Sequence, residues 1–260
     1  MNTIVWEVLM PLHMPVPTTV QWIDIAKSFY EICQMPHCIG GVDGKHCRIQ
    51  CPPNAGSQFY NYKGFHSVVL LAVADAECNF ILVDVGGFGR DNDSKIFSES
   101  AMGKAFNGNK LNIPAQQNII GTDIEMPFYF VGDEAFPLRT NLMRPYARRQ
   151  LNNEKRLFNY RLSRARRTVE CAFGILVRKF GLFTHSISTS LELAEASIKS
   201  ACVLHNYTRK RQNETERNLE REFLEQTNVP PLIGLRPTPA HRGATEAIET
   251  RNKLTAYFSR

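Results

Sequence analysis

The sequence lacks a membrane-spanning run, a secretory signal and any paired cysteine motif. Its longest apolar runs, Ser67–Ala74 and Phe80–Val85, have the length of strands and fall well short of the ~18–20 residues that span a bilayer. The first twenty residues contain Glu7 and no Lys or Arg, so they lack the basic start of a secretory signal. The seven cysteines form no CxxC pair, which favours a reduced intracellular compartment.

The composition is that of an ordinary globular protein. Of the 260 residues, 43% are apolar and 22% are charged, which excludes wholesale disorder. The length allows one large domain or two small ones. We divide the chain into an N-terminal helical lead-in at 1–37, a main domain at 38–208, and a charged tail at 209–260 with a Pro-rich linker and a short terminal helix.

Positive charge is concentrated in one segment. The chain carries a net charge of +6, but Arg139–Phe180 holds twelve Lys or Arg residues against two acids. This segment therefore has a net charge of +10, and the rest of the chain has a net charge of −4. Such a block is typical of a surface that faces a polyanion such as nucleic acid, or alternatively of a solvated helix face.

Hydrophobic periodicity predicts a mixed α/β fold. The expected helices are Thr19–Cys33, Ser94–Phe106, Glu154–Phe180, Leu191–Lys210 and Thr245–Tyr257. The expected strands are Cys38–Gln50, a hairpin of Ser67–Asp75 and Asn79–Gly86, and Pro127–Asp133. The first 36 residues are otherwise weakly patterned, and Val16-Pro17 breaks any early helix.

Three acids stand out by their placement. Asp43 lies within the first predicted strand, Asp133 ends a later strand, and Glu170 lies beside the apolar stripe of the basic helix. Acids on or beside a sheet core are costly unless they meet a cation. Three that converge would form an oxygen-rich site suited to two Mg²⁺ or Mn²⁺ ions, an arrangement that can cleave phosphodiesters.

Each acid also has a purely structural interpretation, and spacing alone does not show that the three converge. Asp43-Gly44 is a common turn sequence, and Asp133 is placed to cap the segment that follows it. Glu170 is placed to pair with Arg166 one turn earlier on the same helix. Such an ion pair would be worth only ~0.3–0.5 kcal/mol.

Five segments strongly resemble those of PIF/Harbinger-type DDE transposases and their domesticated relatives. In chain order they are Cys38–Ile49 (CIGGVDGKHCRI), Asn61–Ser67 (NYKGFHS), Phe130–Leu138 (FVGDEAFPL), Phe158–Phe180 (FNYRLSRARRTVECAFGILVRKF) and Ala201–Tyr207 (ACVLHNY). The resemblance implies an RNase H-like α/β fold, in which a mixed central sheet is flanked by helices. It also places the family's three metal-binding catalytic acids at Asp43, Asp133 and Glu170.

The resemblance implies a metal-dependent DNA endonuclease that hydrolyses or transfers DNA phosphodiesters. Asp93 matches a family position before a helix, where it either supports the metal site or caps that helix. Candidate phosphate contacts are Lys63, Arg139, Arg164, Arg166 and Arg167. The alternative function is a catalytically silent, domesticated transposase that acts as a nuclear interaction or chromatin-associated module.

The family context also sets expectations for partners and location. The DG motif begins near residue 42, so we expect much of the family's further N-terminal region to be missing. A separate Myb/SANT-like protein is then the expected supplier of sequence-specific DNA binding. We expect the protein in the nucleus, with the cytoplasm as the alternative, and we expect no membrane partner.

Overall fold

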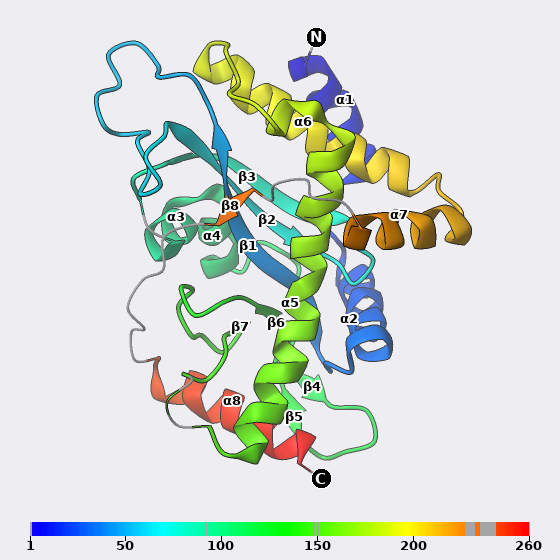
Figure 1. Cartoon of the computed structure of the whole chain (residues 1–260). Helices are drawn as coiled ribbons and strands as arrows, with labels where there is room; N and C mark the ends of the chain where they lie inside the picture. The colour runs from blue at the N-terminus through cyan, green and yellow to red at the C-terminus, as the bar shows by residue number, and fades with distance from the viewer. Residues whose placement is uncertain are drawn as a thin grey trace.

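The fold is built on one mixed β-sheet. The computed structural model describes residues 2–91, 93–147, 149, 151–226, 232–234 and 243–259. The sheet consists of β1 (Cys38–Arg48), β2 (Ser67–Ala74), β3 (Phe80–Phe88), β6 (Tyr129–Val131), β7 (Leu142–Met143) and β8 (Ile233–Gly234). Its order is β3-β2-β1-β6-β7, and β8 pairs with β1 (Figure 1). Strands β1 to β3 are antiparallel, whereas β6 and β7 run parallel to β1, which confirms the expected RNase H-like class.

The predicted hairpin between β2 and β3 is present, and its turn is held by one side chain. The Oδ1 atom of Asp75 accepts hydrogen bonds from the backbone N–H groups of Glu77 and Asn79, at 2.9 and 2.8 Å. Cys78 has a positive φ of 65°, as tight turns often require. All eight residues of β2 are buried, because helices cover both faces of this strand.

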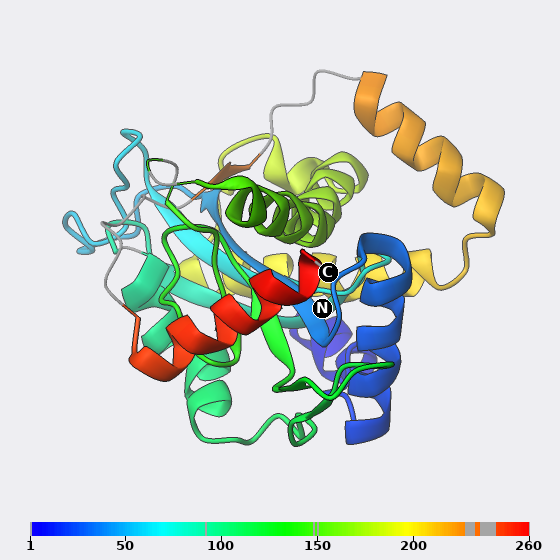
Figure 2. The same ribbon diagram turned by 90° about the horizontal axis from the view of Figure 1, so that it is seen from below.

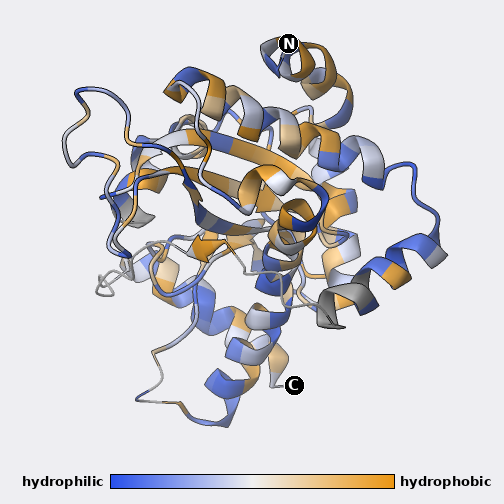
Figure 3. Ribbon diagram, turned by 45° about the horizontal axis from the view of Figure 1, so that its top comes forward, coloured by the Kyte–Doolittle hydropathy of each residue, from blue (hydrophilic) through white to orange (hydrophobic). Residues whose placement is uncertain are grey.

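Helices pack on both faces of the sheet. They are α1 (Asn2–His13), α2 (Thr19–Cys33), α3 (Asp93–Glu99), α4 (Ala101–Asn107), α5 (Asn153–Lys179), α6 (Leu191–Arg209), α7 (Glu214–Gln226) and α8 (Thr245–Phe258). Figure 2 shows helices on both sides of the sheet. Leu70 and Ala72 of β2 face a core formed by α5 and α6, whereas Leu71 and Val73 face α2, α3 and α4. The strands are largely hydrophobic and the helices carry both kinds of residue (Figure 3). Among the described residues, no helix is both long and apolar enough to cross a bilayer.

Two of the expected elements differ from the structure. The single helix predicted over Ser94–Phe106 is two helices, α3 and α4, because Ser100 ends the first and caps the second with a 2.8 Å bond from the N–H of Gly103. The strand predicted over Pro127–Asp133 is shorter, with only Tyr129–Val131 in the ladder. Of the predicted linker at 230–243, only 232–234 and 243 are among the described residues.

The N-terminal helix α1 was missed by the periodicity analysis. It contains Pro11 and has no fully buried residue, yet it packs along α6, with Trp6 and Met10 partly buried against the core. At the other end of the chain, α8 packs against α5. The segments outside 38–208 therefore contribute to the same core, and the domain boundaries stay a prediction.

The LHN sequence at the end of α6 clamps the β2–β3 hairpin. Asn206 accepts a hydrogen bond from the N–H of Phe80 at 2.8 Å, and its amide donates to the carbonyls of Phe80 and His13 at 2.6 and 3.0 Å. His205 is buried with its Nε2 atom 2.8 Å from the carbonyl of Cys78. Burial lowers the pKa of His205 to about 3, so the ring is neutral in the folded protein at neutral pH.

We predict that Asn206→Ala lowers the free energy of unfolding by about 1–3 kcal/mol, because it leaves buried backbone groups without partners. Chemical denaturation at neutral pH measures this difference. The matched control is Asn153→Ala at an exposed position on α5, for which a change below about 0.5 kcal/mol is expected. Equal effects of the two substitutions would contradict the clamp.

Candidate active site

The register of two parallel strands brings Asp43 and Asp133 side by side. Gly41 of β1 is paired with Val131 of β6, and each acid lies two residues further along its own chain. Side chains two residues apart on an extended strand point to the same face. Both acids therefore lie at the same level of the sheet, on the face that α5 covers.

Asp43 is buried and has one incompletely satisfied oxygen. The residue is only 5% exposed, and its Oδ1 atom accepts a 2.8 Å hydrogen bond from the N–H of Gly44. The Oδ2 atom lies 2.9 Å from Lys45 Nζ, but the two do not form a directional hydrogen bond. The strand expected around Asp43 is confirmed, and the alternative of a turn at Asp43-Gly44 is wrong, because both residues lie within β1.

Asp133 accepts a local hydrogen bond, and its surroundings raise the pKa of its carboxyl group. Its Oδ1 atom accepts a 2.9 Å hydrogen bond from the N–H of Ala135, which agrees with the expected capping role. Burial raises the pKa of Asp133, the negative charge of Asp43 raises it further, and Arg166 and Lys45 act in the opposite direction. The two acids and the two cations thus form one electrostatic unit.

Helix α5 crosses β1 at close range, directly beside these acids. A Cβ atom on Gly41 would lie 3.3 Å from the carbonyl oxygen of Ala165 and 3.3 Å from Thr168 Oγ1, so only glycine fits there without displacement of its neighbours. Two turns further along the helix, the ring of Phe173 lies 5.8 Å from Lys45 Nζ. This packing sets the position of Arg166 and Glu170 relative to the sheet.

Glu170 is not gathered with the other two acids. Its Oε1 atom forms a 2.7 Å ion pair with Arg166 Nη1, and its side chain is 41% exposed. The alternative interpretation of Glu170 is therefore the one observed, and Arg166 links it to the charge of Asp133. Within the part of the chain that the structure describes, no three His, Cys, Asp or Glu side chains lie close enough to hold a metal ion together.

The donor chemistry of Asp43 and Asp133 still fits a hard divalent cation. Both groups offer carboxylate oxygens, the ligands that Mg²⁺ and Mn²⁺ prefer. The buried Oδ2 atom of Asp43 faces Lys45 Nζ at 2.9 Å without a directional hydrogen bond, and burial, together with the charge of Asp43, raises the pKa of Asp133. Asp93 starts α3, but its side chain lies outside the described part of the structure, so its role stays a prediction.

The expected phosphate contacts differ in how freely they can act. Arg167 is exposed on α5. Arg164 instead donates a 2.9 Å hydrogen bond to the carbonyl of Ile32 at the end of α2.

The other two candidates lie outside α5. Arg139 donates a hydrogen bond to the Oδ1 atom of Asn107, and exposed Lys63 lies 5.3 Å from the ring of Tyr62. Their roles toward DNA stay predictions.

Lys45 is the site residue that the sequence reasoning missed. The sequence feature that could have identified Lys45 is its place in the DGK sequence, two positions after Asp43 and therefore on the same strand face. The next residue, His46, points away from the acids and lies 2.9 Å from Ser67 Oγ through its Nδ1 atom. Asn61 also donates to Ser67 Oγ, at 2.9 Å, so this part of the NYKGFHS segment holds the β1–β2 connection.

Comparison with known proteins identifies the same region. A family model described as a DDE superfamily endonuclease matches residues 42–206, which include Asp43, Asp133 and Glu170. Among curated proteins, the chain is 29% identical over 173 residues to "Protein ALP1-like" from Arabidopsis thaliana. The match covers 63% of this chain and 40% of the relative. No solved structure matches significantly.

We predict that Asp133→Asn stabilises the protein at pH 7.5 in EDTA. Because the pKa of Asp133 is raised in the folded state, its ionised form opposes folding at neutral pH, and this penalty disappears as the pH falls through the folded-state pKa toward 3.8. The gain should therefore shrink with acidification. Urea unfolding between pH 7.5 and 4.5 measures it.

The matched control for this measurement is Asp24→Asn. Asp24 is an exposed acid on α2 whose ion pair with Lys27 is 3.4 Å long, and its loss should change stability by less than about 1 kcal/mol. If Asp133→Asn destabilises the protein in EDTA at pH 7.5, the attraction of Asp133 to Lys45 and Arg166 outweighs its burial and the repulsion from Asp43.

Proposed function

Because the chain belongs to the DDE superfamily of endonucleases, we propose that it is a divalent-metal-dependent nuclease that cuts or transfers DNA phosphodiesters. The observation that carries this proposal is the parallel register of β1 and β6, which places Asp43 beside Asp133 under the helix that bears Glu170. The chain spans 40% of the length of its curated relative, so the activity of a whole protein is also part of the proposal.

Asp43 and Asp133 would hold the metal, and Glu170 would complete the site. When bound, a pair of Mg²⁺ or Mn²⁺ ions supplies activation of the attacking hydroxyl and charge stabilisation of the leaving oxygen. For Glu170 to take part, its carboxylate must leave Arg166, whose 2.7 Å ion pair lies on a partly exposed helix face. Surface pairs of this kind are worth little, so the exchange has a low cost.

The basic face of α5 would bind the DNA backbone. Arg166 lies partly exposed beside Glu170, and Arg167, the next residue along the helix, is open to solvent. A released Arg166 would gain a phosphate in place of Glu170. Such contacts carry no sequence information, so a separate Myb/SANT-like protein would supply specificity, and a nuclear location would follow.

We predict Mn²⁺-dependent nicking of supercoiled plasmid by the purified chain, lost to background in Asp43→Asn, Asp133→Asn and Glu170→Gln. Double variants should be no worse than single ones, because the three acids act as one unit. Glu154→Gln, an exposed acid on the same helix as Glu170, is the matched control and should retain activity.

A thermal melt with and without Mn²⁺ gives a second readout of the same site. A cation that binds only the folded state adds about 2.7 kcal/mol at a hundredfold excess over Kd, so Mn²⁺ should raise the Tm of wild type and much less that of Asp43→Asn. Absence of both nicking and a Tm shift in wild type would overturn the nuclease proposal in favour of the silent interaction module.

We also predict that Arg167→Ala weakens duplex DNA binding about equally for all sequences and lowers the salt slope by about 1. Wild-type binding should be weak and should fade between about 50 and 200 mM salt. Arg164→Ala should in addition lower the Tm, because Arg164 ties α5 to the end of α2. Fluorescence anisotropy across a salt series measures the binding.

The control for charge alone is Lys110→Ala, an exposed residue that follows α4 on the opposite side of the sheet from α5. It removes one positive charge without touching the basic face of α5. A loss equal to that of Arg167→Ala would show that binding depends on net charge and not on this face.

A further inference from the structure

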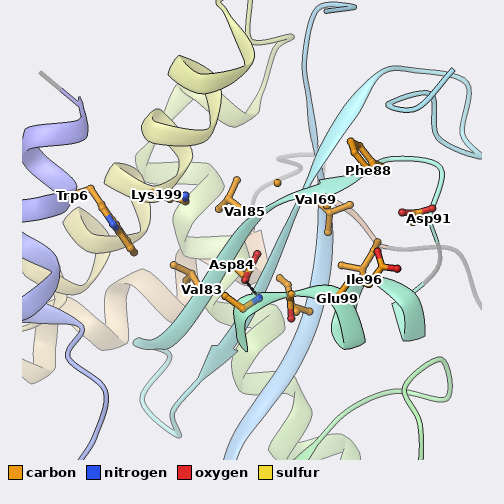
Figure 4. Close-up of a pocket in the computed structure, with 15 residues that line it drawn as sticks. Trp6, Val69, Val83, Asp84, Val85, Phe88, Asp91, Ile96, Glu99 and Lys199 are labelled. Atoms are coloured by element: carbon orange, nitrogen blue, oxygen red, sulfur yellow. Dashed lines mark hydrogen bonds between the residues drawn. The ribbon is translucent and has the colours of Figure 1, made fainter. Parts of the chain in front are cut away.

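Strand β3 leaves one edge of the sheet without a partner. It is the last strand in the order, and no strand among the described residues pairs with its outer side. A cavity of about 510 Å³ runs along this edge and is lined by six consecutive residues, Val83–Phe88 (Figure 4). Unpaired backbone N–H and C=O groups on a sheet edge can bind another extended chain.

The edge lies between walls from both faces of the sheet. Trp6 of α1 and Lys199 of α6 line one side, and Ile96 and Glu99 of α3 line the other (Figure 4). The outer side of β3 is therefore recessed below the helices. A second copy of the chain could not bring its own β3 into pairing distance, because its strand is recessed in the same way.

Two glycines open the backbone of this edge. Gly86 has a φ of +138° and is the extra residue of a β-bulge, since Val69 pairs with Gly87 but Leu70 pairs with Val85. Glycine inside a strand is typical of a bulge or of a place where another backbone approaches closely. Glu195 and Ile96 pack against the two glycines from the helices, and Gly86 and Gly87 themselves add no side chain to this stretch of β3.

The cavity is acidic, in contrast to the chain as a whole. Asp84, Asp91 and Glu99 line it, with Lys199 as the one lining cation among the described residues. A fourth acid is close, since Glu195 Oε1 lies 3.4 Å from the position of a Cβ atom on Gly86. Asp91 is paired with Lys95 at 3.0 Å, and Asp84 accepts hydrogen bonds from the N–H groups of Ala101 and Met102 at the start of α4. The four acids still outnumber the two cations, Lys95 and Lys199, so the cavity keeps a net negative charge that rests mainly on Glu99 and Glu195.

These four observations define the occupant. An acidic cavity repels nucleic acid and also opposes pairing with a second copy of itself, because like charges would face one another. It attracts Lys and Arg side chains, and the apolar residues Val83, Val85 and Ile96 can receive the alternate side chains of an extended chain.

We propose that the outer edge of β3, from Val83 to Gly87, binds an extended basic segment of a partner protein as an added strand. The backbone would supply hydrogen bonds, and the acids of the cavity would select the basic side chains. This function is separate from the proposed nuclease, whose acids Asp43 and Asp133 lie where β1 pairs with β6, away from β3.

The test uses a fluorescent peptide of about nine residues in which Lys and Val alternate, a length that matches a typical strand. Anisotropy should show saturable binding to the full chain, and hydrogen exchange should slow at those amides of Val83–Gly87 that do not bond to β2. Glu99→Lys, at an exposed position, should weaken binding roughly tenfold. The matched reversal Glu222→Lys on exposed α7 should leave binding unchanged.

Several results would overturn the proposal. One is equal binding of the same peptide with Asp in place of Lys, and another is protection of amides elsewhere but not in β3. Slow exchange without peptide at those amides of Val83–Gly87 that do not bond to β2 would mean that the edge is already occupied. If that protection grew with protein concentration, the occupant would be a second copy, and if it did not, a segment of the same chain.

Discussion

The site depends on the parallel pairing of β1 with β6. This pairing sets Gly41 opposite Val131, and it makes neighbours of two acids that are 90 positions apart in the sequence. The short β6 is held in place by further bonds from Tyr129, whose N–H donates to His37 and whose hydroxyl donates to Pro36. Backbone hydrogen bonds thus hold together two carboxylates that repel each other.

One helix contributes to three different tasks. The buried stripe of α5 forms much of the core on one face of the sheet, its polar flank carries Arg166 and Glu170, and its exposed side carries Arg167. All three depend on the close approach at Gly41, where any larger residue would have to push Ala165 away. The packing of the core and the position of the third acid therefore cannot change independently.

Charge divides the molecule into two surfaces. Lys45 of β1 and Arg166 of α5 partly neutralise the acids beneath α5, and the exposed flank of α5 is basic. The β3 edge, at the far end of the strand order, is acidic. The two proposed partners, a DNA backbone and a basic protein segment, would use surfaces of opposite sign. Each surface would repel the other's ligand, so the chain could bind both together.

The sequence alone determined the class of fold and most of its elements, and it nominated the three candidate acids. Periodicity is local, so α2, α5, α6, α8 and the β2–β3 hairpin were predictable, and the order of the motifs pointed to the acids. Helix α1 was not predictable from its sequence. Pro11 and apolar residues on its exposed side, such as Ile4 and Val8, obscure the helical spacing of its apolar residues.

Tertiary structure decided how the acids meet. The register of β1 against β6 joins residues far apart in the chain, and no local pattern encodes it. The Arg166–Glu170 pair could be anticipated from its i, i+4 spacing, but the spacing could not show whether it forms in preference to a three-acid cluster. The recessed β3 edge is likewise a product of packing, because its walls come from α1, α3 and α6, which only the folded chain brings together.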